Sequence, residues 1–225
     1  DGLFDHAVAI KRVRPSLLPE TSRALFDRER RVLATLSHRH IAQLYDGGVD
    51  ETGAPYFIME LVRGAPIDAY AASADLSPRQ IVEKMIAINE AGDPKVVDFG
   101  VARVLRDADD ISLHPQTPGY ASPQRETGAS PTPADDVFAL GAILRALLTG
   151  DAARRAQHTV LTSEAIARSA AFAARSGEWR SNRARLVQGD LDDIIERACA
   201  AAPEDRYQAA VALAADLRAW LETRP

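Results

Sequence analysis

Residues 8–11 read Val8-Ala9-Ile10-Lys11, which places a lysine among strand-forming residues. The alternation around them predicts a strand over residues 7–13, and apolar side chains at helical spacing predict a helix over residues 19–36. Glu29 lies inside the apolar stripe of that helix. Because a carboxylate on an inward face needs a partner, we expect Glu29 to approach Lys11. The alternative is a solvated lysine and a glutamate at the edge of the stripe.

The rest of the chain predicts a small sheet followed by helices. Residues 41–49 and 55–62 are strand candidates, and the turn-forming Asp50-Glu51-Thr52-Gly53 separates them. Residues 134–149 are apolar on nearly all sides, which indicates a buried helix. Its expected core residues are Val137, Leu140, Ile143, Leu144 and Leu147. Further helices are expected over residues 163–176, 191–202 and 207–222.

Composition excludes several classes of protein. The chain has 225 residues, of which 46% are hydrophobic and 26% charged, as in soluble globular domains. Its net charge of −5 is spread over mixed acidic and basic residues, so no basic field that would collect nucleic acid is expected. No apolar run approaches the ~20 residues of a membrane-spanning helix. The single cysteine, Cys199, excludes an internal disulfide framework and favours a cytoplasmic location. The chain has no basic, apolar, small-residue sequence at its start and begins at Asp1 rather than Met, so we expect a fragment without a signal peptide.

Several motifs follow one another in a fixed order. Lys95-Val96-Val97-Asp98-Phe99-Gly100 is a strand followed by Asp-Phe-Gly, and Thr117-Pro118-Gly119-Tyr120-Ala121-Ser122-Pro123 comes after it. Ahead of both, a hydrophobic strand ends in Phe57-Ile58-Met59-Glu60. In this order, and together with Lys11 and Glu29, the motifs resemble those of eukaryotic-like (Hanks-type) bacterial serine/threonine protein kinase domains. An unrelated helical regulator that matches by chance is disfavoured, because the motif order spans the whole chain.

The resemblance implies an α+β, protein-kinase-like bilobal fold. A small antiparallel β-sheet lobe with one helix is expected beside a mostly α-helical lobe. It implies one incomplete kinase-like domain over residues 1–225, with a partial N-lobe over residues 1–61 and a C-lobe over residues 62–225. Asp136 resembles the anchoring aspartate of the family's buried central helix.

The resemblance also implies ATP and Mg²⁺ as cofactors, and a protein substrate or protein partner. It assigns Lys11 to the ATP phosphates and pairs it with Glu29. It assigns Asp98 to Mg²⁺. The segment that receives adenine is expected to include Met59, Glu60 and Val62. The expected regulatory positions are Phe99, Gly100 and Thr117.

The sequence departs from the family pattern at three places. The catalytic loop, His-Arg-Asp followed by Lys and Asn, is absent, since the only His-Arg pair, His38-Arg39, precedes His40. A block has been lost near residues 84–88. Only Gly2 precedes Lys11, so the Gly-rich loop over the phosphates is missing from the given sequence. Gln124 stands where the family has a glutamate, so we expect Arg206 to lack its counter-charge.

Two functions remain open at this point. The first is phosphoryl transfer from ATP to protein serine or threonine, with this chain expected to be catalytically impaired. The second is a pseudokinase that acts as a nucleotide- or protein-binding module.

Overall fold

The computed structural model describes residues 7–12, 37, 42–86, 119–151 and 161–223. The chain divides into two compact units, and each is described by itself. The sheet unit contains residues 7–12 and 42–64. The helical unit contains residues 65–86, 119–151 and 161–223.

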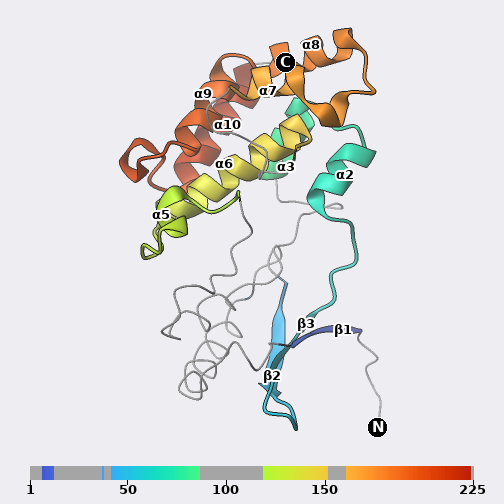
Figure 1. The fold of residues 1–225 in the computed structure, drawn as a ribbon, viewed down its shortest axis with the longest axis vertical. Coiled ribbons are helices and arrows are strands. Elements are labelled where there is room, and N and C mark those ends of the chain that lie inside the picture. Colours follow the sequence, from blue (N-terminus) through green and yellow to red (C-terminus); the bar gives the residue numbers. More distant parts are fainter. Residues whose placement is uncertain (1–6, 13–36, 38–41, 87–118, 152–160, 224–225) are drawn as a thin grey trace. The chain divides into compact units, whose positions relative to one another are not determined.

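The sheet unit contains three antiparallel strands in the order β1-β3-β2 (Figure 1). They are β1 (Val8–Arg12), β2 (Leu44–Val49) and β3 (Pro55–Glu60). Lys11 lies opposite Phe57 in the pairing of β1 with β3, and the pairing of β2 with β3 has an irregularity between Leu44 and Asp46. All three predicted strands are therefore confirmed, each slightly shorter than expected.

The turn between β2 and β3 is organised by Asp50. Its carboxylate accepts hydrogen bonds from the backbone N–H groups of Thr52 and Ala54 and from the Thr52 hydroxyl. The hydrogen bond from the Thr52 hydroxyl is the largest influence that lowers the pKa of Asp50, to about 2. Gly53 completes the turn with a φ of 82°, a conformation that side chains disfavour. Arg12 of β1 reaches this turn and lies 2.6 Å from the Asp50 carboxylate.

The helical unit is built around α6 (Pro133–Thr149). This helix contacts α2 (Ile67–Ser73), α3 (Pro78–Ile86), α7 (Thr162–Arg168), α9 (Asp190–Ala198) and α10 (Ala210–Thr223), as can be followed in Figure 1. Two further helices are α5 (Pro123–Glu126) and α8 (Gly177–Val187), and short 3₁₀ turns cover Ala170–Phe172 and Pro203–Asp205. Of the helices described, none is both long and apolar enough to cross a membrane.

Residues at both ends of α6 explain where it begins and ends. The backbone N–H of Thr132 donates to the Asp135 carboxylate, which satisfies a donor at the helix start, and Pro133 occupies the first turn. Gly150 ends the helix in the left-handed conformation, with a φ of 69°. In the middle, Gly141 allows α9 to approach closely, because a Cβ there would lie 2.8 Å from the Cys199 sulfur.

The core of the helical unit contains the expected α6 residues. Val137, Leu144 and Leu147 are buried, while Leu140 and Ile143 are partly buried against the same cluster. They pack with residues of α3, α9 and α10, among them Ile81, Ile195 and Leu217. The buried central helix is thus confirmed.

Several boundaries differ from the sequence prediction. The helix expected over residues 163–176 is α7 followed by a 3₁₀ turn, and the one expected over residues 191–202 ends at Ala198. The last helix begins at Ala210 rather than at residue 207, because residues 206–209 link it to the preceding 3₁₀ turn. No pattern predicted α2, α3 or α8, which are short or weakly amphipathic. The helix expected over residues 19–36 lies outside the described residues.

Candidate functional site

One face of the sheet carries two of the expected nucleotide-site residues. In an antiparallel pair, directly opposite residues point to the same face. Ala9 lies opposite Met59, and Lys11 lies opposite Phe57. Ala9 and Lys11 are half-buried, whereas their neighbours Val8 and Ile10 on the other face are exposed. The strand pairing therefore brings Lys11 and Met59 to one face, as the motif assignment requires.

The other two expected residues on this unit, Glu60 and Val62, lie at the end of β3 and two residues beyond it. The backbone N–H of Glu60 donates to the Gln43 carbonyl at 2.8 Å, and its carboxylate accepts from the Gln43 backbone N–H at 3.3 Å. Beyond Glu60 the chain leaves the sheet, and Val62 is exposed. Within the described residues, the backbone groups of Val62 have no hydrogen-bond partner.

The remaining expected site residues lie outside the described residues. They are Glu29, Asp98, Phe99, Gly100 and Thr117. The pairing of Lys11 with Glu29 and the coordination of Mg²⁺ by Asp98 therefore stay predictions. In the part of the chain that the structure describes, no group of three His, Cys, Asp or Glu side chains could hold a metal ion.

After Thr117, the residues that the structure describes begin at Gly119. This segment turns into the short helix α5, and the Ser122 side chain caps that helix by accepting a hydrogen bond from the Arg125 N–H at 3.3 Å. The Ser122 hydroxyl also donates to the Asp135 carboxylate at 2.5 Å. The segment is thereby attached to the beginning of α6.

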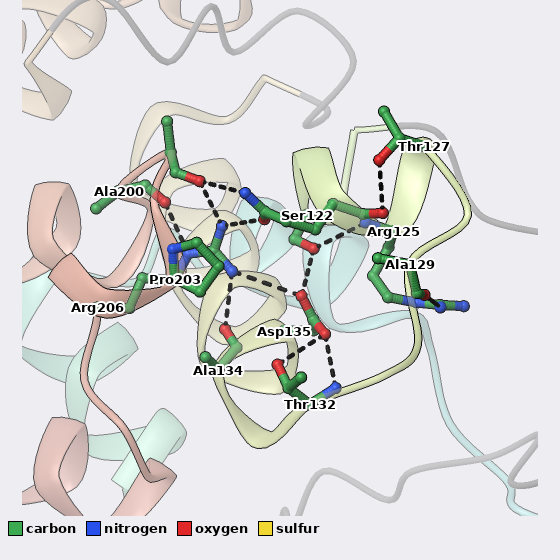
Figure 2. A network of polar contacts seen from close by, with 12 residues as sticks. Ser122, Arg125, Thr127, Ala129, Thr132, Ala134, Asp135, Ala200, Pro203 and Arg206 are labelled. Atoms are coloured by element: carbon green, nitrogen blue, oxygen red, sulfur yellow. Dashed lines mark hydrogen bonds and ion pairs between the residues drawn. The ribbon is translucent and has the colours of Figure 1, made fainter.

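Arg206 forms the centre of a buried polar network, shown in Figure 2. Its side chain is fully buried. The guanidinium donates to the carbonyls of Ala134, Ala200 and Ala201, and to the Gln124 side-chain oxygen at 2.6 Å. The nearest carboxylate in the network is that of Asp135, with an Nη1–Oδ1 distance of 3.5 Å.

This network corrects one sequence-based expectation. Arg206 was expected to lack a counter-charge because position 124 carries a neutral amide. Gln124 does contact Arg206, but Asp135 supplies the negative charge from another element. Sequence reasoning missed Asp135, although the pattern Thr132-Pro133-Ala134-Asp135 is a helix-start signal that singles it out.

The pKa values of the two neighbouring aspartates of α6 are shifted in opposite directions. For Asp135, desolvation raises the pKa, but hydrogen bonds from Ser122 and Thr132 and the charge of Arg206 outweigh it, so that the pKa is lowered. For Asp136, desolvation and then the Asp135 charge raise the pKa. Asp136, the expected anchoring aspartate, is exposed among the described residues. The buried network uses only the first of the two.

The helical unit also contains a cavity of about 290 Å³ between α2, α6 and α8. The two arginines that line it already have partners. Arg175 pairs with Asp75 at 2.8 Å, and Arg183 donates to the carbonyls of Leu76 and Leu148. Burial lowers the pKa of Arg183 to about 10. The contacts of Arg183 attach α8 to the rest of the unit, and the sequence had not singled out Arg175 or Arg183.

Comparisons with known proteins agree with the motif order. The family model described as "Protein kinase domain" matches residues 79–217. The chain is 30% identical over 242 residues to serine/threonine-protein kinase PknB of Mycobacterium leprae, covering 93% of this chain and 38% of that protein. It is 29% identical over 226 residues to serine/threonine-protein kinase PknL of Mycobacterium tuberculosis, covering 88% of this chain and 54% of that protein. The chain thus spans roughly two fifths to half of these relatives.

Solved structures show the same fold. The Mycobacterium tuberculosis PknI kinase domain superposes with a TM-score of 0.65 at 20% sequence identity, covering 96% of this chain and 87% of that one. The small antiparallel sheet and the mostly helical remainder are therefore those of a protein-kinase-like α+β fold. From its motifs, its fold and its relatives, this chain belongs to the protein kinase family, as a Hanks-type bacterial serine/threonine kinase domain.

Proposed function

We propose that this chain binds ATP on the Lys11 face of the sheet and that, as given, it is impaired in transferring the γ-phosphoryl group to protein serine or threonine. Its family uses ATP and Mg²⁺ and acts on proteins. The single observation that carries the proposal is a sequence that retains Lys11 and Asp98 but contains no His-Arg-Asp loop.

The nucleotide side of the proposal rests on the sheet. Lys11 offers an ammonium to the phosphates on the same face as Met59. Val62, an exposed residue just beyond Glu60, would offer its backbone N–H and carbonyl to adenine. Asp98 would hold Mg²⁺, which neutralises charge on the transferred phosphoryl group. Glu29 would orient Lys11.

Regulation and substrate docking are assigned to the segment after Asp98. Phe99 and Gly100 would set whether Asp98 faces the nucleotide. Thr117 stands at the threonine position associated with serine/threonine specificity, and residues 119–126 would receive the protein substrate. The attachment of Ser122 to α6 supports a defined position for these residues.

The impairment follows from what phosphoryl transfer requires. Catalysis of this reaction depends mostly on positioning the two substrates and on stabilising charge. The missing loop supplies the carboxylate that accepts the substrate hydroxyl's proton and a ligand for the second metal ion. Without that carboxylate, bound ATP would face an unoriented hydroxyl. The alternative function is that of a pseudokinase, which binds a nucleotide or a protein without transferring a phosphoryl group.

Transfer is tested with radiolabelled ATP and a generic protein substrate. Three proteins are compared: this chain, its Asp98→Ala variant, and a version with a relative's catalytic loop inserted after Met85. We expect incorporation only after insertion. Incorporation by the unmodified chain that disappears in Asp98→Ala would show that the chain is an active kinase.

Nucleotide binding needs a separate measurement. Titration of a fluorescent ATP analogue with Mg²⁺ should give saturable binding that Lys11→Ala weakens by about tenfold or more, the size expected from a lost charged hydrogen bond. Lys84→Ala is the matched control, because Lys84 lies on α3, where its ammonium contacts the Tyr70 ring. Equal binding by both variants would contradict the assignment of Lys11.

A further inference from the structure

Asp135 lies where three segments distant in sequence meet. Its Oδ1 accepts from the Ser122 hydroxyl and lies 3.5 Å from Arg206 Nη1. Its Oδ2 accepts from the backbone N–H of Thr132 at 2.7 Å and from the Thr132 hydroxyl at 2.9 Å. The side chain is only 10% exposed. One carboxylate thus serves the start of α6, the segment before α5 and the segment before α10, as Figure 2 shows.

The charge of Arg206 depends on this carboxylate. The guanidinium is completely buried, and a buried cation needs a counter-charge as well as hydrogen bonds. Its other acceptors in the described residues, three carbonyls and the Gln124 amide, are neutral. Asp135 is the one carboxylate paired with it in the described part of the chain.

The segment over residues 119–126 has two attachments that lead to Asp135. Ser122 makes the direct one, through its hydroxyl. Gln124 makes the indirect one: its side-chain oxygen accepts from Arg206, and its nitrogen donates to the Ala201 carbonyl at 2.7 Å. Loss of the Asp135 charge would therefore weaken both attachments together.

We infer that Asp135 is a positioning residue that holds residues 119–126 in place, directly through Ser122 and indirectly through the buried Arg206 and Gln124. This inference deepens the proposed function, on which it rests only for the role of the segment in substrate docking. It also implies that a carboxylate at position 124 can balance the charge of Arg206 in place of the carboxylate at position 135. A carboxylate at position 124 would stand 2.6 Å from the guanidinium and could replace the one at position 135.

The test uses hydrogen–deuterium exchange on the full 225-residue chain, because exchange does not require catalysis. The reporters are the amides of residues 125–129, which donate to acceptors within the segment. In Asp135→Asn, we expect these amides to exchange about tenfold faster while the amides of α9 are little changed, since a local attachment is lost. Ser122→Ala should give a smaller acceleration at residues 126–129, because the counter-charge of Arg206 is kept; the Arg125 amide is left out of this comparison because it loses its own acceptor.

A second variant separates positioning from general damage. Adding Gln124→Glu to Asp135→Asn should restore much of the slow exchange, whereas Gln124→Glu alone should not slow it further, since one carboxylate already balances Arg206. Asp193→Asn is the matched control, because Asp193 is an exposed aspartate in the first turn of α9.

Two results would overturn the inference. The first is unchanged exchange at residues 125–129 in Asp135→Asn. The second is a uniform acceleration that includes α9 and that Gln124→Glu does not correct. If the loop-inserted chain transfers phosphate, Asp135→Asn should raise the KM for the protein substrate more than it lowers kcat. If no version transfers phosphate, the expectation that the inserted loop restores transfer fails, while the exchange result still decides the role of Asp135.

Discussion

The two units each contain an arginine–aspartate pair, and the pairs differ in a way that distance alone does not reveal. In the sheet unit, Arg12 and Asp50 are 2.6 Å apart, with side chains 56% and 28% exposed. In the helical unit, Arg206 and Asp135 are 3.5 Å apart, with side chains 0% and 10% exposed. Water screens the first pair, whereas the second has replaced its water by protein groups. We therefore expect the Arg206–Asp135 pair, although its distance is longer, to contribute more to the free energy of unfolding than the Arg12–Asp50 pair.

The largest effect should come from removing the buried cation. Arg206→Ala would leave Asp135 without its cation and would remove a donor from each of the carbonyls of Ala134, Ala200 and Ala201. The expected loss in free energy of unfolding is about 3–5 kcal/mol, as for other broken buried pairs. Urea unfolding followed by circular dichroism measures it. Arg197→Ala, which removes a 57% exposed arginine from α9, is the control. A loss no larger than the control's would remove the contrast between the two units.

A close helix contact should give the next largest effect. In Gly141→Ala, the new methyl group would lie 2.8 Å from the Ala198 Cβ and from the Cys199 sulfur, so α6 and α9 must separate. Overpacking of this kind costs about 1–3 kcal/mol, which exceeds the ~1 kcal/mol that alanine gains over glycine in a helix. Thermal unfolding should show a lower Tm. A higher Tm would mean that α6 and α9 can move apart at little energetic cost.

The pH dependence of stability should show how much the charge of Asp135 contributes to the buried pair. The pKa of Asp135 is lowered in the fold from its ordinary value of 3.8, so its stabilising contribution is present above about pH 3.8 and is lost as the pH falls through the folded value. Unfolding midpoints measured from pH 5 downwards should fall less steeply in Asp135→Asn than in the original chain. Parallel curves would show that the Asp135 charge contributes nothing.

The smallest effect is expected for the exposed pair. Arg12→Ala removes the partner of Asp50, but that carboxylate keeps its hydrogen bonds to Thr52 and Ala54. We expect Tm to change by no more than about 2 °C, because exposed ion pairs contribute little. The change should shrink in 0.5 M salt, where screening is stronger. A large loss of Tm would indicate that the turn depends on Arg12.

For Gln124→Glu, the sequence and the structure lead to different expectations about stability. From the sequence, this change should raise the unfolding midpoint, because Arg206 has no carboxylate at position 124. The contact with Arg206 is confirmed, but the premise is wrong, since Asp135 already balances the charge. The gain should therefore emerge mainly in the Asp135→Asn background.

Local patterns were sufficient where the determining residues are neighbours in sequence. The apolar run of α6, with Pro133 at its start and Gly150 at its end, specifies a buried helix by itself. The alternation around Lys11 and the turn residues 50–53 likewise specify the strands. By contrast, α8 has little amphipathic pattern, so its packing through Arg183 could not be read from its own residues.

The sequence by itself determined the kinase-family motifs, the succession of strands and main helices along the chain, and the absence of a His-Arg-Asp loop. Each of these depends on residue identity within a short window. Only the tertiary structure decided which carboxylate meets Arg206, because Asp135, Gln124 and Arg206 come from separate segments. Burial then decides the importance of that contact, since a cation removed from water requires the charge that the fold brings to it.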